Sequence, residues 1–358
     1  MTTTMRRLTE YSHGGGCACK LPQSMLDDVV TMMRQAGVPQ SDESGLLIGL
    51  DTPDDAAVYA IDNTKAWIVT TDFLTPLVDD PRDWGRIAAT NALSDVYAMG
   101  GRPLIALNIL AWPTDLGADM LNKVLHGGAD AVSAAGALVV GGHSITDPIP
   151  KYGLVAIGEV ERDKILTKGG ARPGDLLVLT KPIGVGIIST AVKRGQAPQN
   201  SRTAAVASMT RLNSSASRIA SEAGLKGATD ITGYGLIGHL HEMAAAAGLG
   251  ARIDIDRVPL LPGVTALIAD DCSPDGSRRT LVNALRKGWF EPSSLPQEQQ
   301  LLLADAQTSG GLLLAVPPHD AASVVAALRA GGDAHACVIG ELVDDGRPGV
   351  VTAETSTR

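Results

Sequence analysis

The sequence predicts an α+β protein of two domains with mixed sheets flanked by helices. The chain has 358 residues, and domains of about 100–200 residues are usual, so its length favours two domains. Hydrophobic residues make up 44% of the chain and aromatic residues only 3%, which indicates a sizeable core of Ala, Val, Leu and Ile. Expected strands and helices alternate irregularly in both halves, and this pattern favours two α+β domains over one doubly wound sheet.

Residues 1–50 are expected to form a glycine-rich arm and one helix. The arm contains "YSHGGGCACK", Tyr11–Lys20, in which three glycines precede Cys-Ala-Cys and a lysine. Apolar side chains then share one helical face at Met25, Val29, Met32 and Met33. Ser24 can cap the start of this helix and Gly37 can end it.

Residues 51–162 are expected to form the first domain. In order, its predicted elements are strands over 54–62 and 65–73, a helix over 80–101, a strand over 102–112, a helix over 115–136, and strands over 137–144 and 151–160. Gly127 and Gly128 predict a break in the second helix, and Gly141 and Gly142 predict a turn that ends the strand before His143.

Residues 163–358 are expected to form the second domain, after a glycine-rich turn over 164–175. In order, its predicted elements are a strand over 175–181, helices over 182–195 and 200–224, a strand, glycine turn and helix over 228–248, a strand over 251–259, and a strand, helix and strand between 301 and 343. The sequence shows no short-period repeat.

Charge, apolar runs and cysteine content exclude several classes of protein. The net charge of -9 argues against a general nucleic-acid binder, because phosphate backbones need surplus Lys and Arg. The apolar runs are shorter than the ~20 residues of a membrane span, and the N-terminus lacks the hydrophobic segment of a secretory signal. Four cysteines do not make a disulfide framework. We therefore expect a cytoplasmic, reduced protein without a membrane or nucleic-acid partner.

Five aspartates are candidate site residues: Asp54, Asp55, Asp72, Asp95 and Asp230. Each adjoins or lies within an apolar or small-residue segment, where an unpaired buried carboxylate is costly. Hard oxygen ligands suit Mg²⁺, which commonly binds one or two carboxylates together with substrate phosphates. Helix caps and turns are the alternative for any single aspartate. That alternative is weaker for Asp95, which lies inside a predicted helix.

Glycine turns give only weak indications of a nucleotide site. There is no P-loop. "GYGLIG" at 233–238, followed by Asp254 and Asp256, fits a dinucleotide-binding fingerprint, but the preceding segment is too polar for its central strand. "GVGIIS" at 184–189 and "GGHS" at 141–144 could present backbone N–H groups to an anion, although each is more often a turn.

The cysteines and histidines leave several interpretations open. Cys17 and Cys19 could bind zinc with His13, but their spacing is tighter than usual for zinc. Cys272 and Cys337 resemble buried structural cysteines. Of the remaining histidines, His239 and His241 point to different faces of one helix, and His143 is by default a capping or core residue.

Cys17 and Lys20 also fit a catalytic arm. A nearby lysine can lower the pKa of a thiol or reach a phosphate, and Gly14–Gly16 can act as a hinge that closes the arm over a substrate. A frayed terminus is the alternative interpretation.

Seven segments together resemble selenophosphate synthetase, the selenide, water dikinase family. They are "YSHGGGCACK", "DDAAVY", "TTDFLTPLVDDPRDWGRIAATNALSDVYAMGGRP", "VGGHSI", "LTKPIGVG", "ATDITGYGLIGHL" and "QTSGGLLLAV". The resemblance runs in order from Tyr11 to the end of the chain. It implies the two-domain fold of aminoimidazole ribonucleotide synthetase, a homodimer joined through the N-terminal sheets, and ATP in a cleft near the domain and subunit junctions.

The resemblance implies that ATP, selenide and water are converted to selenophosphate, AMP and orthophosphate. Cys17 matches the position that is cysteine or selenocysteine in the family, and Lys20 matches its essential lysine. Asp55, Asp95 and Asp230 match magnesium ligands. The ATP-binding positions implied are Lys20, Thr52, Pro53, Asp54, Asp72, Asp95, Gly142, His143 and Ser144. More than one Mg²⁺ is expected, with a monovalent cation such as K⁺ and a selenium-delivery protein as further candidates.

Two rival functions remain at this stage. A ribonucleotide cyclo-ligase or thiamine-phosphate kinase would share the fold, but those families do not need the "HGGGCACK" arm. A non-catalytic redox or metal-binding protein would use Cys17 and Cys19, but it would leave the aspartates and glycine turns without a purpose. The nucleotide product, AMP or ADP, separates these functions.

Overall fold

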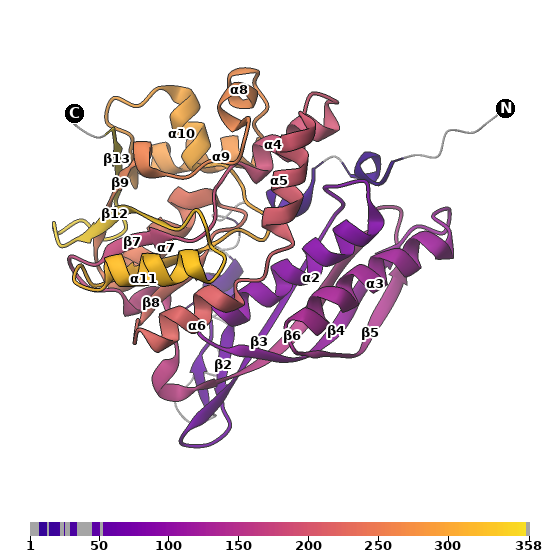
Figure 1. Cartoon of the computed structure of the whole chain (residues 1–358), viewed down its shortest axis with the longest axis horizontal. Coiled ribbons are helices and arrows are strands. Elements are labelled where there is room, and N and C mark those ends of the chain that lie inside the picture. Colours follow the sequence, from indigo (N-terminus) through magenta and orange to yellow (C-terminus); the bar gives the residue numbers. More distant parts are fainter. Residues whose placement is uncertain are drawn as a thin grey trace.

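The computed structural model describes residues 7–12, 14–21, 25, 29–33, 45–50 and 53–355, and the structural statements below concern these residues. Two sheets organise the chain, one in each half (Figure 1). Most of the helix predicted after Ser24 lies outside the described residues, although residues 25 and 29–33 are helical. Within the described ranges, no helix is long and apolar enough to cross a membrane.

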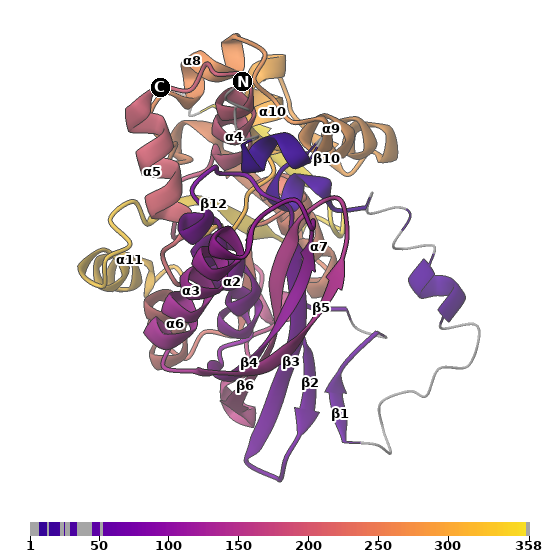
Figure 2. The ribbon, with the colours of Figure 1, turned by 90° about the vertical axis from the view of Figure 1, so that its right-hand side faces the viewer.

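The N-terminal sheet has six strands in the order β1-β2-β3-β6-β4-β5. They are β1 (Leu46–Ile48), β2 (Ala57–Ala60), β3 (Lys65–Leu74), β4 (Arg102–Trp112), β5 (Leu138–Thr146) and β6 (Lys151–Glu161). All neighbours pair antiparallel except β4 and β5, which are parallel. Helices α2 (Pro81–Ala98) and α3 (Ala118–Ala134) cover one face of the sheet (Figure 2). The predicted strands and helices of this half are present.

Three glycines let α2, α3 and β6 pack in close contact. A Cβ on Gly127 would overlap the Arg82 carbonyl oxygen, and a Cβ on Gly128 would overlap the Tyr152 hydroxyl. On α2, Gly85 makes the same kind of contact with the α3 backbone. Helix α3 continues through both of its glycines, so the predicted helix break is wrong. The two glycines mark a contact surface, because close packing here leaves no space for a side chain.

Strand β5 likewise continues through Gly141 and Gly142, so the glycine turn predicted there is wrong. A Cβ on Gly142 would overlap the Asn108 backbone on β4. These glycines therefore belong to the parallel pairing of β5 with β4, and β5 is the edge strand of the sheet.

The C-terminal sheet has seven strands in the order β10-β13-β9-β12-β7-β11-β8. They are β7 (Leu176–Leu179), β8 (Gly227–Asp230), β9 (Gly250–Asp254), β10 (Phe290–Glu291), β11 (Leu312–Val316), β12 (Cys337–Val343) and β13 (Val351–Glu354). The helices of this half are α4 (Val185–Lys193), α5 (Gln199–Met209), α6 (Ser214–Glu222), α7 (Gly235–Ala247), α8 (Val264–Ala269), α9 (Asp275–Lys287), α10 (Gln297–Leu303) and α11 (Ala321–Ala330). Both sheets are mixed, which confirms the predicted α+β class.

In the C-terminal half, one predicted helix is wrong and three helices were not predicted. The single helix predicted over 200–224 is two helices, α5 and α6, because Asn213 between them turns inward. Its amide donates to Ser94 Oγ and to the Gly310 carbonyl oxygen, both at 2.9 Å. Helices α8, α9 and α10 were not predicted, and α9 contacts the N-terminal arm.

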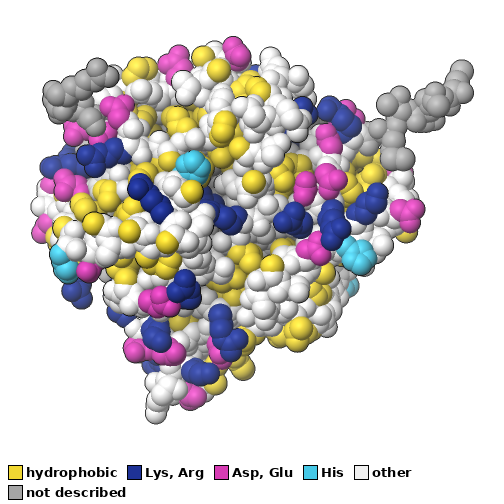
Figure 3. Space-filling view, in the orientation of Figure 1, with side chains coloured by type: hydrophobic (Ala, Val, Ile, Leu, Met, Phe, Trp, Pro, Cys, Tyr) yellow, Lys and Arg dark blue, Asp and Glu magenta, His cyan; other side chains and the backbone are white. Residues whose placement is uncertain are grey.

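The outer face of the N-terminal sheet, opposite α2 and α3, is apolar and exposed. Its exposed side chains include Tyr59, Trp67, Val69, Phe73, Leu138 and Ile145. A contiguous apolar face of this kind normally contacts another surface. Elsewhere, positive and negative side chains are interspersed among apolar ones, as the face in Figure 3 shows.

Candidate active site

The arm docks against the body of the protein through backbone contacts. It forms a short 3-10 helix, η2 (Gly16–Cys19), that contacts β3 and α9. The Gly16 N–H donates to the Thr75 carbonyl oxygen at 3.2 Å. A Cβ on Gly276 of α9 would lie 2.6 Å from one arm carbonyl oxygen, and a Cβ on Gly233 would lie 2.8 Å from another. Real side chains do not fit at such distances, so both glycines are needed for this docked position.

Polar contacts fix the arm on the N-terminal side of η2. Thr9 donates to Asp79 Oδ1 through its N–H (3.0 Å) and its hydroxyl (2.7 Å). Lys193 Nζ of α4 donates to the Ser12 carbonyl oxygen at 3.0 Å and also to that of Gly14. The arm therefore contacts both halves of the chain on either side of its glycines.

Cys17 lies at the centre of a hydrogen-bond network between the two halves. Its thiol donates to Asn91 Oδ1 of α2 at 3.3 Å, and its N–H donates to Thr308 Oγ1 at 3.0 Å. The side chain is buried, and burial together with the negative charge of Asp72 raises the pKa of the Cys17 thiol to about 12. Lys20 opposes this rise but does not outweigh it. Lys20 thus acts on the pKa of Cys17 in the expected direction, but the thiolate character expected of a nucleophilic Cys17 is absent in the docked arm.

Asn91 joins Cys17 to the acidic part of the site. Its amide donates to Asp72 Oδ2 at 2.6 Å, and its Oδ1 also accepts the Ser309 N–H at 2.8 Å. Ser309 has a left-handed backbone (φ 51°), a strained conformation that is common at functional sites. Asn91, Thr308 and Ser309 were not among the predicted site residues. Only the position of Asn91 four residues before Asp95 could have indicated its role.

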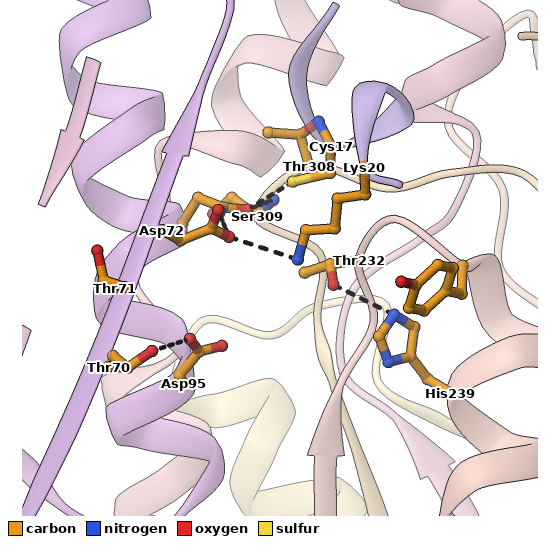
Figure 4. Close-up of polar contacts among 12 residues, drawn as sticks. Cys17, Lys20, Thr70, Thr71, Asp72, Asp95, Thr232, His239, Thr308 and Ser309 are labelled. Carbon is orange, nitrogen blue, oxygen red and sulfur yellow. Dashed lines mark hydrogen bonds and ion pairs between the residues drawn. The ribbon is translucent and has the colours of Figure 1, made fainter. Parts of the chain in front are cut away.

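Lys20 extends from the arm toward the same carboxylate (Figure 4). Its Nζ lies 3.5 Å from Asp72 Oδ2. Asp72 raises the pKa of Lys20 well above the ordinary lysine value, so the side chain is a permanent cation. The thiol and the ammonium group of the arm thus approach one aspartate, Cys17 through Asn91 and Lys20 directly.

Asp95 and Asp230 are two further carboxylates near Lys20 and Asp72. Thr70 Oγ1 donates to Asp95 Oδ2 at 2.5 Å, whereas Asp230 Oδ2 is buried and accepts no hydrogen bond from the described residues. Burial and the neighbouring Asp230 raise the pKa of Asp95 well above its ordinary value. Burial and the neighbouring Asp55 raise the pKa of Asp230 to about 7. These carboxylates repel one another and lack a full set of positive partners.

Asp54 and Asp55 meet a buried lysine that was not predicted. Lys168 Nζ lies 3.0 Å from Asp55 Oδ1 and 2.9 Å from Glu242 Oε2. The Lys168 N–H donates to Asp54 Oδ2 at 3.0 Å, and Thr229 Oγ1 donates to Asp55 Oδ1 at 3.0 Å. Lys168 lies in the glycine-rich turn that the sequence indicated only as a connection between domains.

The carboxylates fit a divalent cation. Asp55 Oδ2 and Asp230 Oδ2 are both buried without a hydrogen-bond partner in the described part of the chain, and oxygen ligands of this kind suit Mg²⁺. No three His, Cys, Asp or Glu side chains among the described residues are grouped closely enough to hold a metal on their own. The expected Mg²⁺ ligands Asp55, Asp95 and Asp230 therefore need further oxygen ligands, such as phosphates.

Other predicted ATP-binding residues are not brought to this centre. Gly142, His143 and Ser144 lie on β5, three strands from Asp72 on β3, a separation of about 14 Å at the usual strand spacing. His143 is in register with Phe73 and so lies on the outer face. Pro53 is exposed beside Asp54, and Thr52 lies outside the described residues.

The structure also tests the weaker motif interpretations. The N–H groups of Gly184 and Gly186 donate to Gln307 and Asp305, so "GVGIIS" does not offer them to an anion. The strand before "GYGLIG", β8, is an edge strand that pairs antiparallel with β11 and otherwise forms an isolated bridge from Gly227 to Thr167. This arrangement contradicts a dinucleotide-binding unit, which needs a central parallel strand.

The histidines and cysteines give no zinc site among the described residues. His239 is buried with its Nε2 3.1 Å from Thr232 Oγ1, and His241 stacks on Trp289. His13 and the Cys19 side chain lie outside the described residues.

The chain matches two family models in succession. Residues 53–160 match the N-terminal domain of AIR synthase related proteins, and residues 172–353 match the C-terminal domain. Solved structures share this fold. A ThiL protein complexed with AMPPCP and TMP has a TM-score of 0.66 at 19% identity, with 100% of this chain and 98% of that chain covered. The hydrogenase maturation protein HypE in complex with ATP has a TM-score of 0.64 at 20% identity, with coverage of 98% and 95%.

Curated relatives are similar over nearly the whole chain. Selenide, water dikinase of Myxococcus xanthus is 46% identical over 351 residues, covering 98% of this chain and 97% of the relative. Selenide, water dikinase of Paraburkholderia xenovorans is 46% identical over 352 residues, with 98% of each chain covered. Fold and site thus define an AIR synthase related enzyme with an N-terminal arm docked at its carboxylate cluster. Within that class, the chain belongs to the selenide, water dikinase family.

Proposed function

We propose that this chain makes selenophosphate from ATP, selenide and water, and releases AMP and orthophosphate, at the centre formed by the docked arm and the buried carboxylates. Membership of the selenide, water dikinase family supports the reaction. The observation that carries the assignment of the centre is the connection of Cys17 and Lys20 to the single carboxylate of Asp72.

In this proposal, Lys20 binds the transferring phosphate. Its side chain is partly exposed and its ammonium group lies beside Asp72, where a positive charge can stabilise the charge that develops on the γ-phosphate oxygens. Asp72 positions Lys20, and the same oxygen of Asp72 accepts the Asn91 amide. Asn91 in turn orients the Cys17 thiol. The docked arm excludes water from the first transfer, where water would compete with selenide for the phosphate.

Cys17 is proposed to contact selenium as a protonated thiol while the arm is docked. A pKa of about 12 leaves the thiol protonated near neutral pH, so selenide rather than Cys17 supplies the nucleophile in this state. In the overall reaction, selenide takes the γ-phosphoryl group, and water then cleaves the remaining diphosphate to AMP and orthophosphate. If Cys17→Ser keeps full selenide-dependent ATP consumption, the thiol has no role in the reaction.

Asp55, Asp95 and Asp230 are the proposed ligands of Mg²⁺, with Asp54 beside them. Bound there, Mg²⁺ would neutralise phosphate charge and act as a Lewis acid. The unpartnered oxygens of Asp55 and Asp230 support this assignment. A requirement for K⁺ remains a prediction, and magnesium and potassium dependence can be measured by replacing each ion in turn.

A homodimer through the N-terminal sheets is also proposed. The exposed apolar outer face supports it, since such a surface is costly in water. Sedimentation equilibrium would test it, and a monomer at micromolar concentration would contradict it. Delivery of selenium by a separate protein remains a prediction.

The nucleotide product tests the reaction. The protein is incubated with MgATP, with and without selenide, and nucleotides are separated by chromatography. Selenide-dependent AMP is the expected result. ADP as the final nucleotide would instead indicate a kinase such as the fold relatives, and no turnover would indicate a binding protein.

A further inference from the structure

A cavity lies on the side of the arm where α9 packs. It has a volume of about 360 Å³. The arm forms one wall, with Cys17 and Lys20 among its residues, and α9 forms the other wall with Arg278, Arg279 and Arg286. We call this cavity the arginine pocket. No Asp or Glu is among the described residues that line it, although the chain as a whole carries a net charge of -9.

Two of these arginines, Arg279 and Arg286, lie on the same face of α9. Arg279, Asn283 and Arg286 follow one another at i, i+4 and i+7, so they share one face of α9. The opposite face buries Leu281 and Ala284. Arg286 donates to Asn283 Oδ1 at 3.3 Å, and Arg279 forms no ion pair with any described residue. The exposed guanidinium groups of Arg279 and Arg286 are therefore available to an anion.

The two sides of the arm differ in charge. Asp72 and Asp95 lie on the inner side, where Lys20 and the Cys17 thiol point (Figure 4), and the charge of Asp230 also acts on Lys20 there. These carboxylates attract a metal-bound nucleotide but repel a free anion. Selenide is a monoanion, HSe⁻, near neutral pH. A cleft lined by positive charge concentrates such an anion and speeds its arrival.

The apolar part of the pocket favours a weakly hydrated anion. Leu21, Tyr234 and Val282 also line the cavity. The side chains of Leu21 and Val282 have no hydrogen-bond donors for the many oxygens of a polyphosphate, and the Tyr234 hydroxyl donates to the Leu21 carbonyl oxygen at 3.3 Å. Arginine is itself weakly hydrated. A large, singly charged selenium anion fits this mixture of guanidinium and apolar surface better than ATP does.

We infer that the arginine pocket is the entry and holding site for the selenium anion, on the opposite side of the arm from the carboxylates. This inference rests on the proposed function, because it assigns the second substrate of that reaction to a place. Selenide and MgATP would then approach Cys17 and Lys20 from oppositely charged sides, and neither would have to pass the other.

The double variant Arg279→Gln/Arg286→Gln tests this inference in steady-state assays with sodium selenide and MgATP. We expect kcat/KM for selenide to fall about tenfold and to lose most of its salt dependence, whereas KM for ATP stays within about twofold. Arg279→Lys/Arg286→Lys keeps the charge and should retain most of the rate. The matched control Arg218→Gln/Arg252→Gln removes two exposed arginines on other elements, α6 and β9, and should leave the selenide parameters unchanged.

A second measurement does not depend on selenium chemistry. Alkylation of Cys17 by anionic iodoacetate and by neutral iodoacetamide is followed by peptide mass spectrometry. The ratio of the two rates should fall about tenfold in Arg279→Gln/Arg286→Gln and stay constant in the control. Because it is a ratio for one thiol, it cancels differences in how often the arm opens.

The outcomes separate this inference from the proposed function. An unchanged kcat/KM for selenide and an unchanged alkylation ratio would overturn the inference. A rise in KM for ATP equal to that for selenide would also overturn it, because the pocket would then serve the nucleotide. Absence of selenide-dependent AMP in the unmodified protein would instead overturn the proposed function.

Discussion

Two lysines meet aspartates in this site, and their surroundings differ. Lys20 is on the arm, with its side chain 36% exposed and, within the described part of the chain, one ion pair, of 3.5 Å to Asp72. Lys168 is in a turn between the domains, with its side chain 10% exposed and ion pairs of 3.0 and 2.9 Å to Asp55 and Glu242. Both neutralise carboxylates, but the side chain of Lys20 is the more exposed of the two and its ion pair is the longer.

From this difference we propose that Lys20 is a reacting cation and Lys168 a structural one. Lys20 has one loose partner and can exchange it for a phosphate at little cost. Lys168 lies between two carboxylates. The free-energy cost of burying its charge is compensated only while both carboxylates stay in place. The predictions below test this division, from the largest expected effect to the smallest.

Replacement of Lys168 by Met should have the largest effect. It leaves the buried carboxylate of Asp55 and the partly buried one of Glu242 without their cation, and loss of one partner of a buried ion pair typically costs about 3–5 kcal/mol. Urea unfolding at pH 7 measures this loss. Lys164→Met is the matched control, because Lys164 pairs with Glu161 on the surface, and it should change stability by less than about 1 kcal/mol. Equal effects of the two substitutions would show that Lys168 is not a structural cation.

Replacement of Lys20 by Met should instead remove activity and keep stability. Loss of one group that stabilises developing charge typically lowers kcat by about 10²–10³. The free energy of unfolding should change by less than about 1 kcal/mol, because the side chain is partly exposed. Selenide-dependent AMP formation and urea unfolding give the two values. A variant that is unstable but retains its kcat would reverse the roles of the two lysines.

Gly276→Ala should displace the arm without harming the body of the protein. The added Cβ would lie 2.6 Å from the Ala18 carbonyl oxygen, so the arm must shift, and small displacements of reacting groups can cost about 10²-fold in rate. Gly276 lies within α9, where alanine favours the helix by about 1 kcal/mol. We therefore expect lower kcat/KM with unchanged or slightly increased stability. Wild-type activity in this variant would mean that the docked arm is not the reacting arrangement.

Lys181, which is fully buried, should change stability gradually, through pH. Burial lowers the pKa of Lys181 from its ordinary value to about 7, while its Nζ donates to the carbonyl oxygens of Arg211 and Ser309. Above pH 7 the unfolded state binds more protons at this site than the folded state. Stability should therefore rise with pH between about 7 and 10.5, by at most about 1.4 kcal/mol per pH unit.

Comparison with Lys181→Met isolates this pH effect. Urea unfolding of both proteins at pH 7, 8 and 9 should show the rise only in the protein that retains Lys181. If the two proteins change in parallel, Lys181 does not cause the pH dependence.

The sequence predicted the elements with strong apolar patterns and the residues with obvious chemistry. The strands from β2 to β7 and the helices α2 and α7 are of this kind. The candidate site residues Cys17, Lys20, Asp72, Asp95 and Asp230 lie near one another in the structure, and their roles stay predictions. Their signals are local, because periodicity and isolated polar residues can be recognised within a short stretch of chain.

What the sequence did not predict depends on contacts between distant segments. Asn91 binds Cys17 across 74 positions, and Lys168 binds Glu242 across 74 and Asp54 across 114. Nothing near Lys168 in the sequence distinguishes it from an ordinary turn lysine. The glycines of α3 and β5 were misinterpreted for the same reason, since the groups that exclude a side chain there come from α2, β4 and β6.

The contact between α2 and α3 also has a genetic consequence. Glycine is the smallest residue, so every missense change at Gly85, Gly127 or Gly128 adds atoms where backbone or the Tyr152 ring already lies. None of these positions touches the reacting groups. Inherited variants here should therefore lower the amount of folded protein in the cell, and the molecules that do fold should keep their turnover number.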